Sequence, residues 1–483
     1  MLLMRLFIVF IVFFTSLSHA QVGIGTTSPD LASLLDISST TQGVLLPRMT
    51  SAQMNAIPDP VKGLTIFNSE SNSYYFFNGG SWEELAGAVK RDNYKLVKDI
   101  ADLADELDAG GGSRYLMNSD FLYEINGAIA FDFPLELNDC YIDGVDVRGD
   151  VLRNNTGGAL IVGPTGGSLR NVTLDGNGST IFNITGTGSE TVVLNSIPYV
   201  NASSLGTVSG INFLYMNTGQ FLNCSEGIVL NDIATIFAEN LFWTSTCSGT
   251  FMTLGGAFDD FQFNNGNVTV DSGETGLDLS ANPVINLSAS LNGVSFKGDG
   301  QFVNPYTSGT YGDYNFTVNW YVNSSGILNE SHELANADFY YDGDITTGFN
   351  QTINTDAAVE IQGNPAVAVY GSDKLFLFSV GGDGNRLVYD GKITRAFQVV
   401  ASLAIRVENA NNDFYGFTVA KNGVSLERSN AVVRIDNATQ IQSVSINSVV
   451  DLSNNDYVEI FVHRLTGSGN DTFVVFSENV SIK

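Results

Sequence analysis

Acidic side chains are the residues of this sequence best suited to chemistry, and they gather at two places. They are Asp143, Asp146 and Asp150, near Arg148 and Arg153, and the isolated pair Asp259 and Asp260. Two carboxylates about 5 to 10 Å apart can hydrolyse a glycosidic bond. The alternative is that these residues lie in solvated turns, which aspartate favours. We favour the turns, because spacing along the chain does not show that the carboxylates converge.

Basic partners for these carboxylates are scarce. Residues 115–327 contain four basic side chains and no histidine. A polysaccharide lyase needs a base close to a carboxylate-bound Ca²⁺. His463 lies in a late apolar run, and we interpret it as a surface or interface residue and not as a metal ligand. We therefore predict no catalytic residue and no cofactor, and leave bound Ca²⁺ open.

Aromatic side chains offer a second kind of chemistry, the stacking of sugar rings. Phe213, Tyr215, Phe242 and Trp243 lie in short alternating runs. Alternation places about half of such residues in a core. Carbohydrate recognition is therefore expected as binding without catalysis, and no individual aromatic residue is assigned to it.

Composition indicates a β-rich protein outside the cytoplasm. The chain has 50 Gly, only 10 Pro and a net charge of −29. This charge disfavours a nucleic-acid partner. Residues 1–20 combine Arg5, an apolar run and a small-residue end, which indicates a secretory signal peptide cleaved before Gln21. We predict a secreted protein of the cell surface without a transmembrane segment.

Three cysteines, Cys140, Cys224 and Cys247, follow the expected cleavage site. They have no CxxC spacing. An oxidising compartment could close one pair, and Cys224 with Cys247 is favoured because they lie about one repeat apart. The alternative, three buried thiols in a core, is at least as well supported.

A helix with a coiled-coil repeat is predicted over residues 81–112. Ser81 and Glu84 suit a capping box, and Gly110 to Gly112 suit a helix end. The apolar or seam positions, which we assign to oligomerisation, are Val89, Asn93, Leu96, Ile100, Leu103 and Leu107. A lone helix of this length is marginal in water, so we predict a homotrimeric neck. The alternative is one helix packed on its own domain.

Residues 21–80 contain VGIGTTSPD, then LLPRMT, then GLTIFN and an N-G-x-x-W ending. This succession resembles the N-terminal segment of secreted surface proteins of Bacteroidota and of tail-fibre-like proteins. Strands are expected at Thr65–Asn68 and Tyr74–Asn78, with a turn at Asn78 to Gly80. The resemblance implies an attachment or shaft module.

A loose repeat follows, in which Asn precedes a short apolar alternation. Its members begin at Asn171, Asn212, Asn240, Asn267 and Asn292, at intervals of 41, 28, 27 and 25 residues. One coil of a parallel β-solenoid uses about 20 to 50 residues. The passages YEINGAIAFDFPLELNDCYIDGVDVRG and GGSLRNVTLDGNGSTIFNI resemble pectate-lyase-like right-handed β-helices. The 41-residue interval is either one coil with an inserted loop or two short coils, and a β-sandwich is the competing fold.

Longer alternating runs near the C-terminus predict an antiparallel sandwich. They are Phe397–Val407, Tyr415–Val419, Val444–Ile446 and Tyr457–Val462. The segment VDLSNNDYVEIFV resembles the late strands of C1q/TNF-like jelly rolls, with Asn455 where that family usually has Gly. Such heads are commonly trimers, as the resemblance implies.

The sequence therefore predicts a mainly β protein with a right-handed parallel β-helix, a coiled-coil neck and a C-terminal jelly roll. The expected parts are 1–20 signal peptide, 21–80 attachment segment, 81–112 neck, 113–327 β-helix, 328–370 connector and 371–483 head. The favoured function is a trimeric, fibre-like adhesion protein that recognises surface glycans. A β-helix polysaccharide lyase or glycoside hydrolase and a phage tail fibre or spike remain alternatives.

Overall fold

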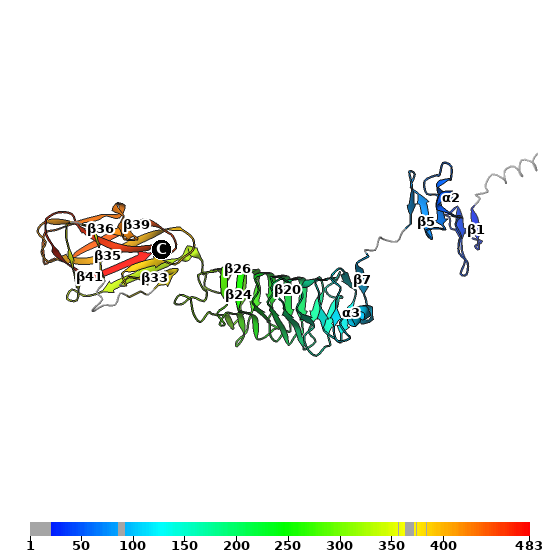
Figure 1. Cartoon of the computed structure of the whole chain (residues 1–483), viewed down its shortest axis with the longest axis horizontal. Helices are drawn as coiled ribbons and strands as arrows, with labels where there is room; N and C mark the ends of the chain where they lie inside the picture. The colour runs from blue at the N-terminus through cyan, green and yellow to red at the C-terminus, as the bar shows by residue number, and fades with distance from the viewer. Residues whose placement is uncertain (1–20, 86–91, 356, 363–370, 373, 383) are drawn as a thin grey trace, which may run out of the picture. The chain divides into compact units, whose positions relative to one another are not determined.

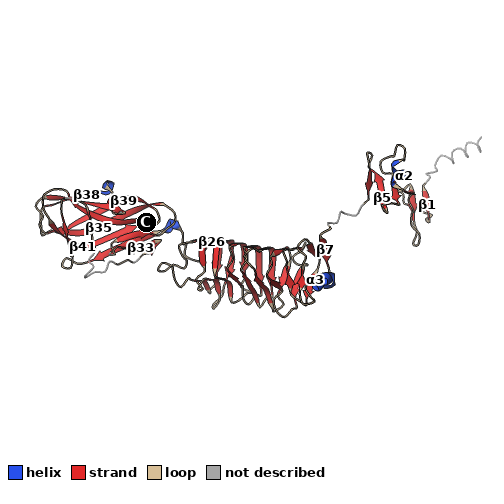
Figure 2. Ribbon diagram, viewed as in Figure 1, coloured by secondary structure: helices blue, strands red, loops and turns tan. Residues whose placement is uncertain are grey.

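The structure, a computed structural model, describes residues 21–85, 92–355, 357–362, 371–372, 374–382 and 384–483. Strands dominate these residues, and helices are few and short (Figure 2). The chain divides into two compact units between Asp92 and Asn93, and each is described by itself. Among the described residues, no helix combines the length and hydrophobicity needed to cross a lipid bilayer.

The first unit contains one parallel strand pair and one small sheet. The pair is β1 (Val22–Ile24) and β2 (Leu35–Ile37); the sheet runs in the order β3 (Arg48–Met49), β4 (Thr65–Asn68), β5 (Ser73–Phe77) and β6 (Trp82–Glu84). Helix α2 (Ser51–Asn55) is capped by Thr50, whose hydroxyl accepts a hydrogen bond from the backbone N–H of Gln53 in a capping box. The strand expected at 65–68 is confirmed, and the one expected at 74–78 lies one residue earlier.

The second unit begins with a parallel β-solenoid, whose strands form three columns. The first column is β7 (Tyr94–Val97), β9 (Leu122–Ile125), β12 (Tyr141–Asp143), β15 (Gly167–Arg170), β18 (Thr191–Val200), β20 (Phe213–Leu222), β22 (Thr235–Trp243), β24 (Ala257–Thr269), β26 (Val284–Lys297) and β28 (Trp320–Ser325). The second is β10 (Ala128–Phe131), β13 (Val151–Asn154) and β16 (Thr173–Asp175), and continues as the C-terminal half of β18 and of the long strands after it. The third is β8 (Tyr115–Leu116), β11 (Leu135–Glu136), β14 (Ile161–Gly163), β17 (Thr180–Thr185), β19 (Ser204–Ser209), β21 (Ile228–Asn231), β23 (Thr250–Gly255), β25 (Thr275–Asp278) and β27 (Gln301–Asn304). The predicted solenoid is confirmed.

The solenoid core is a stack of apolar side chains from successive coils. Because strand side chains alternate, one residue in two points inward, and these residues are almost completely buried. Tyr199 and Phe221 stack with ring centroids 4.8 Å apart, and Trp243 lies 5.7 Å from Phe221 on the next coil. Such continuous stacking gives each coil a neighbour on which to bury its apolar face.

A column of left-handed residues forms the corner between the first and second columns. Its members are Asn171, Ser196, Thr218, Asn240, Asn265 and Gly293, with φ between 52° and 70°. The intervals between successive members are 25, 22, 22, 25 and 28 residues. Asn and Gly tolerate this conformation best. The predicted period is therefore correct, but of the five predicted members only Asn171 and Asn240 are corner residues. The interval of 41 arose because Asn212 lies elsewhere in the coil, and the corners that follow Asn171 are Ser196 and Thr218.

The predicted helix over 81–112 is wrong for the residues described there. Residues 82–84 and 94–97 are strands, followed by the short helices η2 (Ile100–Leu103) and α3 (Ala104–Ala109). Leu103 is completely buried in the solenoid core, and Ile100 and Leu107 pack against it. Leu96 lies in β7, Asn93 donates from its side-chain amide to the carbonyl of Asp120, and Val89 lies outside the described residues.

The apolar residues Leu96, Ile100, Leu103 and Leu107 therefore do not form the seam of a coiled coil. They build a strand and a short cap over the first coil, and Figure 1 shows α3 beside β7 at the end of the stacked coils. Buried Glu106 holds this cap in place, because it accepts hydrogen bonds from Lys95 (2.7 Å) and Tyr123 (2.8 Å). Covering the open end protects its unpaired backbone groups.

Two antiparallel sheets form the sandwich that ends the described chain. One runs β32 (Leu375–Phe376), β29 (Asn336–Asp342), β41 (Asp471–Ile482), β35 (Arg395–Val407) and β39 (Gln442–Leu452), with β30 (Phe349–Ile353) also paired to β41. The other runs β33 (Phe378–Gly381), β34 (Arg386–Tyr389), β40 (Tyr457–Arg464), β36 (Asp413–Lys421) and β37 (Val424–Ser425), with β31 (Val359–Glu360) on β40 and β38 (Ala431–Ile435) on β36. Short helices η3 (His332–Leu334) and η4 (Glu427–Ser429) lie outside the sheets.

The four strands predicted in this region are all present, each inside a longer strand. Asn455 has φ 66°, so it adopts the left-handed turn expected of it. The sandwich begins earlier than predicted, because β29, β30 and β31 lie within the expected connector of 328–370. Likewise, the solenoid begins at β7 and not at residue 113.

Candidate functional site

The first group of predicted carboxylates supports turns of the solenoid. Asp150 accepts the backbone N–H groups of Gly127, Val145 and Asp146 at 2.8 to 2.9 Å. Burial acts to raise the pKa of Asp150, but these hydrogen bonds outweigh it and leave the pKa below its usual value. Asp143 accepts a hydrogen bond from the side-chain amide of Asn171. These side chains have structural partners on adjacent coils.

The second group, Asp259 and Asp260, lies on β24 and also has partners on the next coil. Asp259 accepts from the amide of Asn286 (2.8 Å), and Asp260 accepts from the hydroxyl of Ser288 (2.9 Å). Arg153 pairs with Asp175 at 2.9 Å. Within the described part of the chain, no cluster of three His, Cys, Asp or Glu side chains could hold a metal ion. The structure therefore does not bring the two predicted groups together.

The first column presents two outward rows that follow the solenoid from coil to coil. One is rich in aromatic and apolar residues: Tyr94, Leu122, Tyr141, Ser168, Val193, Tyr215, Phe237, Gln262, Ser290 and Tyr321. The other becomes rich in amides: Leu96, Glu124, Asp143, Arg170, Asn195, Asn217, Glu239, Asn264, Asn292 and Asn323. Parallel strands lie about 4.8 Å apart, so both rows repeat at that spacing.

The four aromatic residues named from the sequence divide between core and surface. Trp243 points inward and is 1% exposed, whereas Phe242 is 42% exposed. Phe213 and Tyr215 are half-buried on the outer face, and Phe213 meets Phe237 edge to face at 5.5 Å. Three of the four are therefore accessible from the surface of the solenoid.

A shallow depression of about 510 Å³ surrounds the one strongly exposed member of this set, Phe242. We call it the Phe242 depression. It is lined by Thr218, Gly219, Gln220, Phe242, Trp243, Thr244, Ser245, Asn267 and Thr269. These residues come from β20, β22 and β24 and from the turn after β22. The sequence alone did not indicate this depression, because its lining residues come together only when three coils are aligned.

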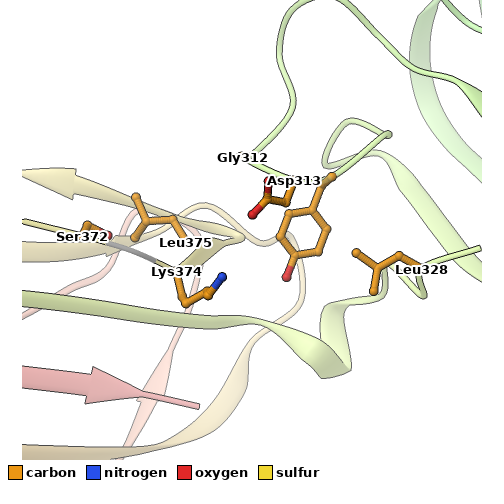
Figure 3. Close-up of a pocket in the computed structure, with 7 residues that line it drawn as sticks. Gly312, Asp313, Leu328, Ser372, Lys374 and Leu375 are labelled. Carbon is orange, nitrogen blue, oxygen red and sulfur yellow. The ribbon is translucent and has the colours of Figure 1, made fainter.

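A smaller pocket of about 300 Å³ lies where the last solenoid loop meets the sandwich. Figure 3 shows Asp313 and Leu328 from the solenoid side facing Lys374 and Leu375 from the sandwich. The ring of Tyr314 lines this pocket and stacks on Phe376 with centroids 4.1 Å apart. One acidic and one basic side chain thus line the same pocket.

The favoured cysteine pair lies on adjacent coils. Cys224 and Cys247 are buried free thiols, as is Cys140. The amide of Ser248 donates to the carbonyl of Cys224 at 2.8 Å, which places the two cysteines in adjacent turns. Interaction with the neighbouring Cys224 thiol lowers the pKa of Cys247, and interaction with Cys247, together with burial, raises the pKa of Cys224.

Comparison with known proteins gives one family match. Residues 23–99 match the model of the family described as "Phage tail like trimerisation region". This match supports a homotrimer. It begins within the first unit and extends through β7, so it overlaps the predicted neck without requiring a coiled coil.

No curated protein matches the chain. Among solved structures, the chain is similar to one titled "Structure of Eiger TNF from S. frugiperda", with 12% identity and a TM-score of 0.20. The similarity covers 31% of this chain and 92% of that chain.

Proposed function

We propose that this chain is the protomer of a trimeric, fibre-like structural protein of a cell surface that recognises carbohydrate. The observation that carries the proposal is the match of residues 23–99 to a phage tail-like trimerisation region, followed by a solenoid and a sandwich. In this role the chain acts as a spacer that presents binding surfaces to their ligands.

The solenoid suits such a role physically. Each coil packs only on its neighbours, and the ten strands of the first column hold their outer side chains at fixed intervals. Three copies of each outer face in one trimer would multiply weak contacts with a repetitive surface through effective concentration.

Export and surface attachment are the second part of the proposal. Residues 1–20 have the charge, apolar run and small-residue end of a signal peptide. A net charge of −29 favours solubility of an exposed protein. We expect the mature chain to begin at Gln21, which N-terminal sequencing of protein released from the producing cell would test.

The deciding experiment measures mass and binding on the same full-length mature protein. Sedimentation equilibrium should give three times the protomer mass, and an array of neutral and acidic glycans should give reproducible binding. A monomer at micromolar concentration would contradict the fibre-like assembly. A trimer that binds no glycan would contradict the recognition role alone.

A phage tail fibre or spike is the second candidate, and the description of the matching family favours it. The two candidates differ in processing and location. A chain that retains residues 1–20 and copurifies with phage particles would favour the second candidate. A chain that begins at Gln21 on the cell surface would favour the first.

A further inference from the structure

We infer that the Phe242 depression is a binding site for a neutral saccharide chain, with the Phe242 ring as the platform for one sugar. This inference rests on the proposed function and deepens it, because it assigns the recognition to one place on the solenoid. The argument starts from the position of the ring.

The strand pairing places an amide on each side of Phe242. Phe242 is aligned with Gln220 on the preceding coil and with Asn267 on the following coil. Adjacent parallel strands lie about 4.8 Å apart. A sugar resting on the ring is therefore within reach of one amide along each direction of the solenoid axis.

The ring itself is available for stacking. Leu241 and Trp243 point into the core, so Phe242 points outward and is 42% exposed. Among the described residues, no other aromatic ring packs against it. A sugar ring presents an apolar face of C–H groups, which can cover an aromatic face while its hydroxyls stay in contact with polar groups.

The polar groups around the ring are suited to hydroxyls. The amide of Gln220 has no partner among the described residues, and Asn267 accepts only a weak bond from Thr269 at 3.4 Å. An amide donates and accepts, as a sugar hydroxyl does. By contrast, Thr244 already donates to the carbonyl of Phe221 at 2.7 Å and supports the rim.

Charge decides which sugars fit. None of the nine lining residues carries a formal charge, although the chain has a net charge of −29. The depression therefore lacks a cation to pair with a uronate or sulfate, and the surrounding negative potential disfavours an acidic polymer. A neutral saccharide chain needs no cation and is not repelled by the negative potential. The volume of about 510 Å³ lies within the usual range of ligand pockets, roughly 300 to 1,000 Å³.

A second copy of this chain is the competing occupant. A protein contact of useful size buries about 800 Å² on each partner and has an apolar centre. Here a single exposed aromatic side chain lies among amides and hydroxyls in a concave surface. This arrangement fits a polar ligand with one apolar face better than a protein surface.

The test uses the full-length mature protein, an array of neutral glucan, mannan and xylan oligosaccharides, and polygalacturonate as an acidic comparison. The best neutral probe on the array is then titrated against three variants. Phe242→Ala should weaken binding at least about tenfold, equivalent to ~1.4 kcal/mol, and Phe242→Tyr should restore it. Gln220→Ala should weaken it less, because one of several hydrogen bonds is lost.

Tyr321→Ala is the matched control. Tyr321 is 41% exposed on β28 of the same solenoid, outside the Phe242 depression, so its loss should leave the affinity unchanged. Sedimentation equilibrium of every variant monitors assembly. Because Phe242 lies outside the core, Phe242→Ala should remain folded and trimeric.

Three results would overturn the inference. Unchanged glycan affinity in Phe242→Ala would do so while leaving the proposed recognition function intact elsewhere on the protein. Dissociation of the Phe242→Ala trimer would instead make the depression a contact between copies. If the unaltered trimer bound polygalacturonate and no neutral probe, the inference would fail although carbohydrate recognition would stand.

Discussion

At the scale of single residues, burial and partners decide what each charged side chain does. The acidic residues that drew attention in the sequence accept hydrogen bonds in turns or from the next coil. Two other buried charged residues, Glu330 and Arg464, were not singled out from the sequence. Nothing in a single sequence marks them, because their burial depends on loops that meet only after folding.

Glu330 should make stability fall as pH rises. It is 2% exposed, and burial raises its pKa from 4.5 to about 7, although the backbone N–H groups of Asn315 and Phe316 oppose the shift. A raised pKa means that the folded state holds a proton which the unfolded state releases. Its contribution is therefore complete below about pH 4.5 and is lost as pH rises through about 7.

Glu330→Gln should remove this dependence. The Tm difference between the variant and the unaltered protein should grow in favour of the variant from about pH 5 to about pH 8. Glu190→Gln is the opposite control, because hydrogen bonds led by that of the Thr187 hydroxyl lower the pKa of Glu190 to about 2. That variant should lose stability above about pH 4.5. A Glu330→Gln difference that does not change with pH would contradict the assignment.

Arg464 should be essential to the sandwich. Its guanidinium is 5% exposed, pairs with Asp413 at 2.7 Å and Asp471 at 3.1 Å, and donates to carbonyls of the loop 466–469. Arg464→Leu leaves two buried carboxylates without their cation, so unfolding of the sandwich should be easier by about 3 to 5 kcal/mol. Urea titration of both variants measures the free energy of unfolding. Arg434→Leu, at an exposed position, should change this free energy by less than about 0.5 kcal/mol.

At the scale of elements, the sequence predicted periods well and boundaries poorly. The solenoid was predictable because corner residues such as Asn171 and Asn240 recur wherever a left-handed turn is needed. The register of the repeat was not predicted correctly, since Asn212, Asn267 and Asn292 occupy other places in the coil. The prediction of a helix over 81–112 was wrong because apolar residues spaced three and four positions apart also suit a strand followed by a short cap. Leu96 lies in that strand and Leu103 in the cap.

The corner column gives a matched pair of variants. Asn265 has φ 58° and its neighbour Asn264 lies in the same strand with its side chain on the outer face. Valine is disfavoured in the left-handed region and favoured in strands. Asn265→Val should therefore lower the free energy of unfolding by about 1 to 2 kcal/mol, whereas Asn264→Val should not. Equal effects in thermal denaturation would contradict the assigned corner.

Cys224 and Cys247 should form a disulfide when the protein is exposed to a disulfide oxidant. The oxidant takes two electrons, both thiol protons leave, and one S–S bond forms. Closing a 23-residue loop should add roughly 3 kcal/mol of stability. Peptide mapping without reduction should find Cys224 joined to Cys247 and Cys140 free. Alkylation of all three cysteines in denatured, unreduced protein from an oxidising compartment would exclude the bond.

At the scale of the whole molecule, the family match indicates a trimerisation region that overlaps the heptad pattern of 81–112 only in part and lies mostly before it. The predicted homotrimer stands, now supported by the family match over residues 23–99. The position of the proposed carbohydrate site could not be predicted from the sequence, because Gln220, Phe242 and Asn267 are more than twenty positions apart and meet only through the stacking of coils.

Removing residues 21–92 should convert the trimer to a monomer. The remaining unit has its own hydrophobic cores in the solenoid and the sandwich, so it should stay folded, with cooperative thermal unfolding as the check. Light scattering measures the mass. A trimer that survives the deletion would transfer the assembly role to the solenoid or the sandwich.

The cap that η2 and α3 form over β7 has a consequence for how this architecture changes over generations. Because η2 and α3 cover one end of the stack and every interior coil contacts only its two neighbours, the duplication or deletion of one coil would change the length of the solenoid by about 4.8 Å. The packing of the other coils would change little. The length of the solenoid can thus evolve in uniform increments of one coil, while the modules at its two ends stay unchanged.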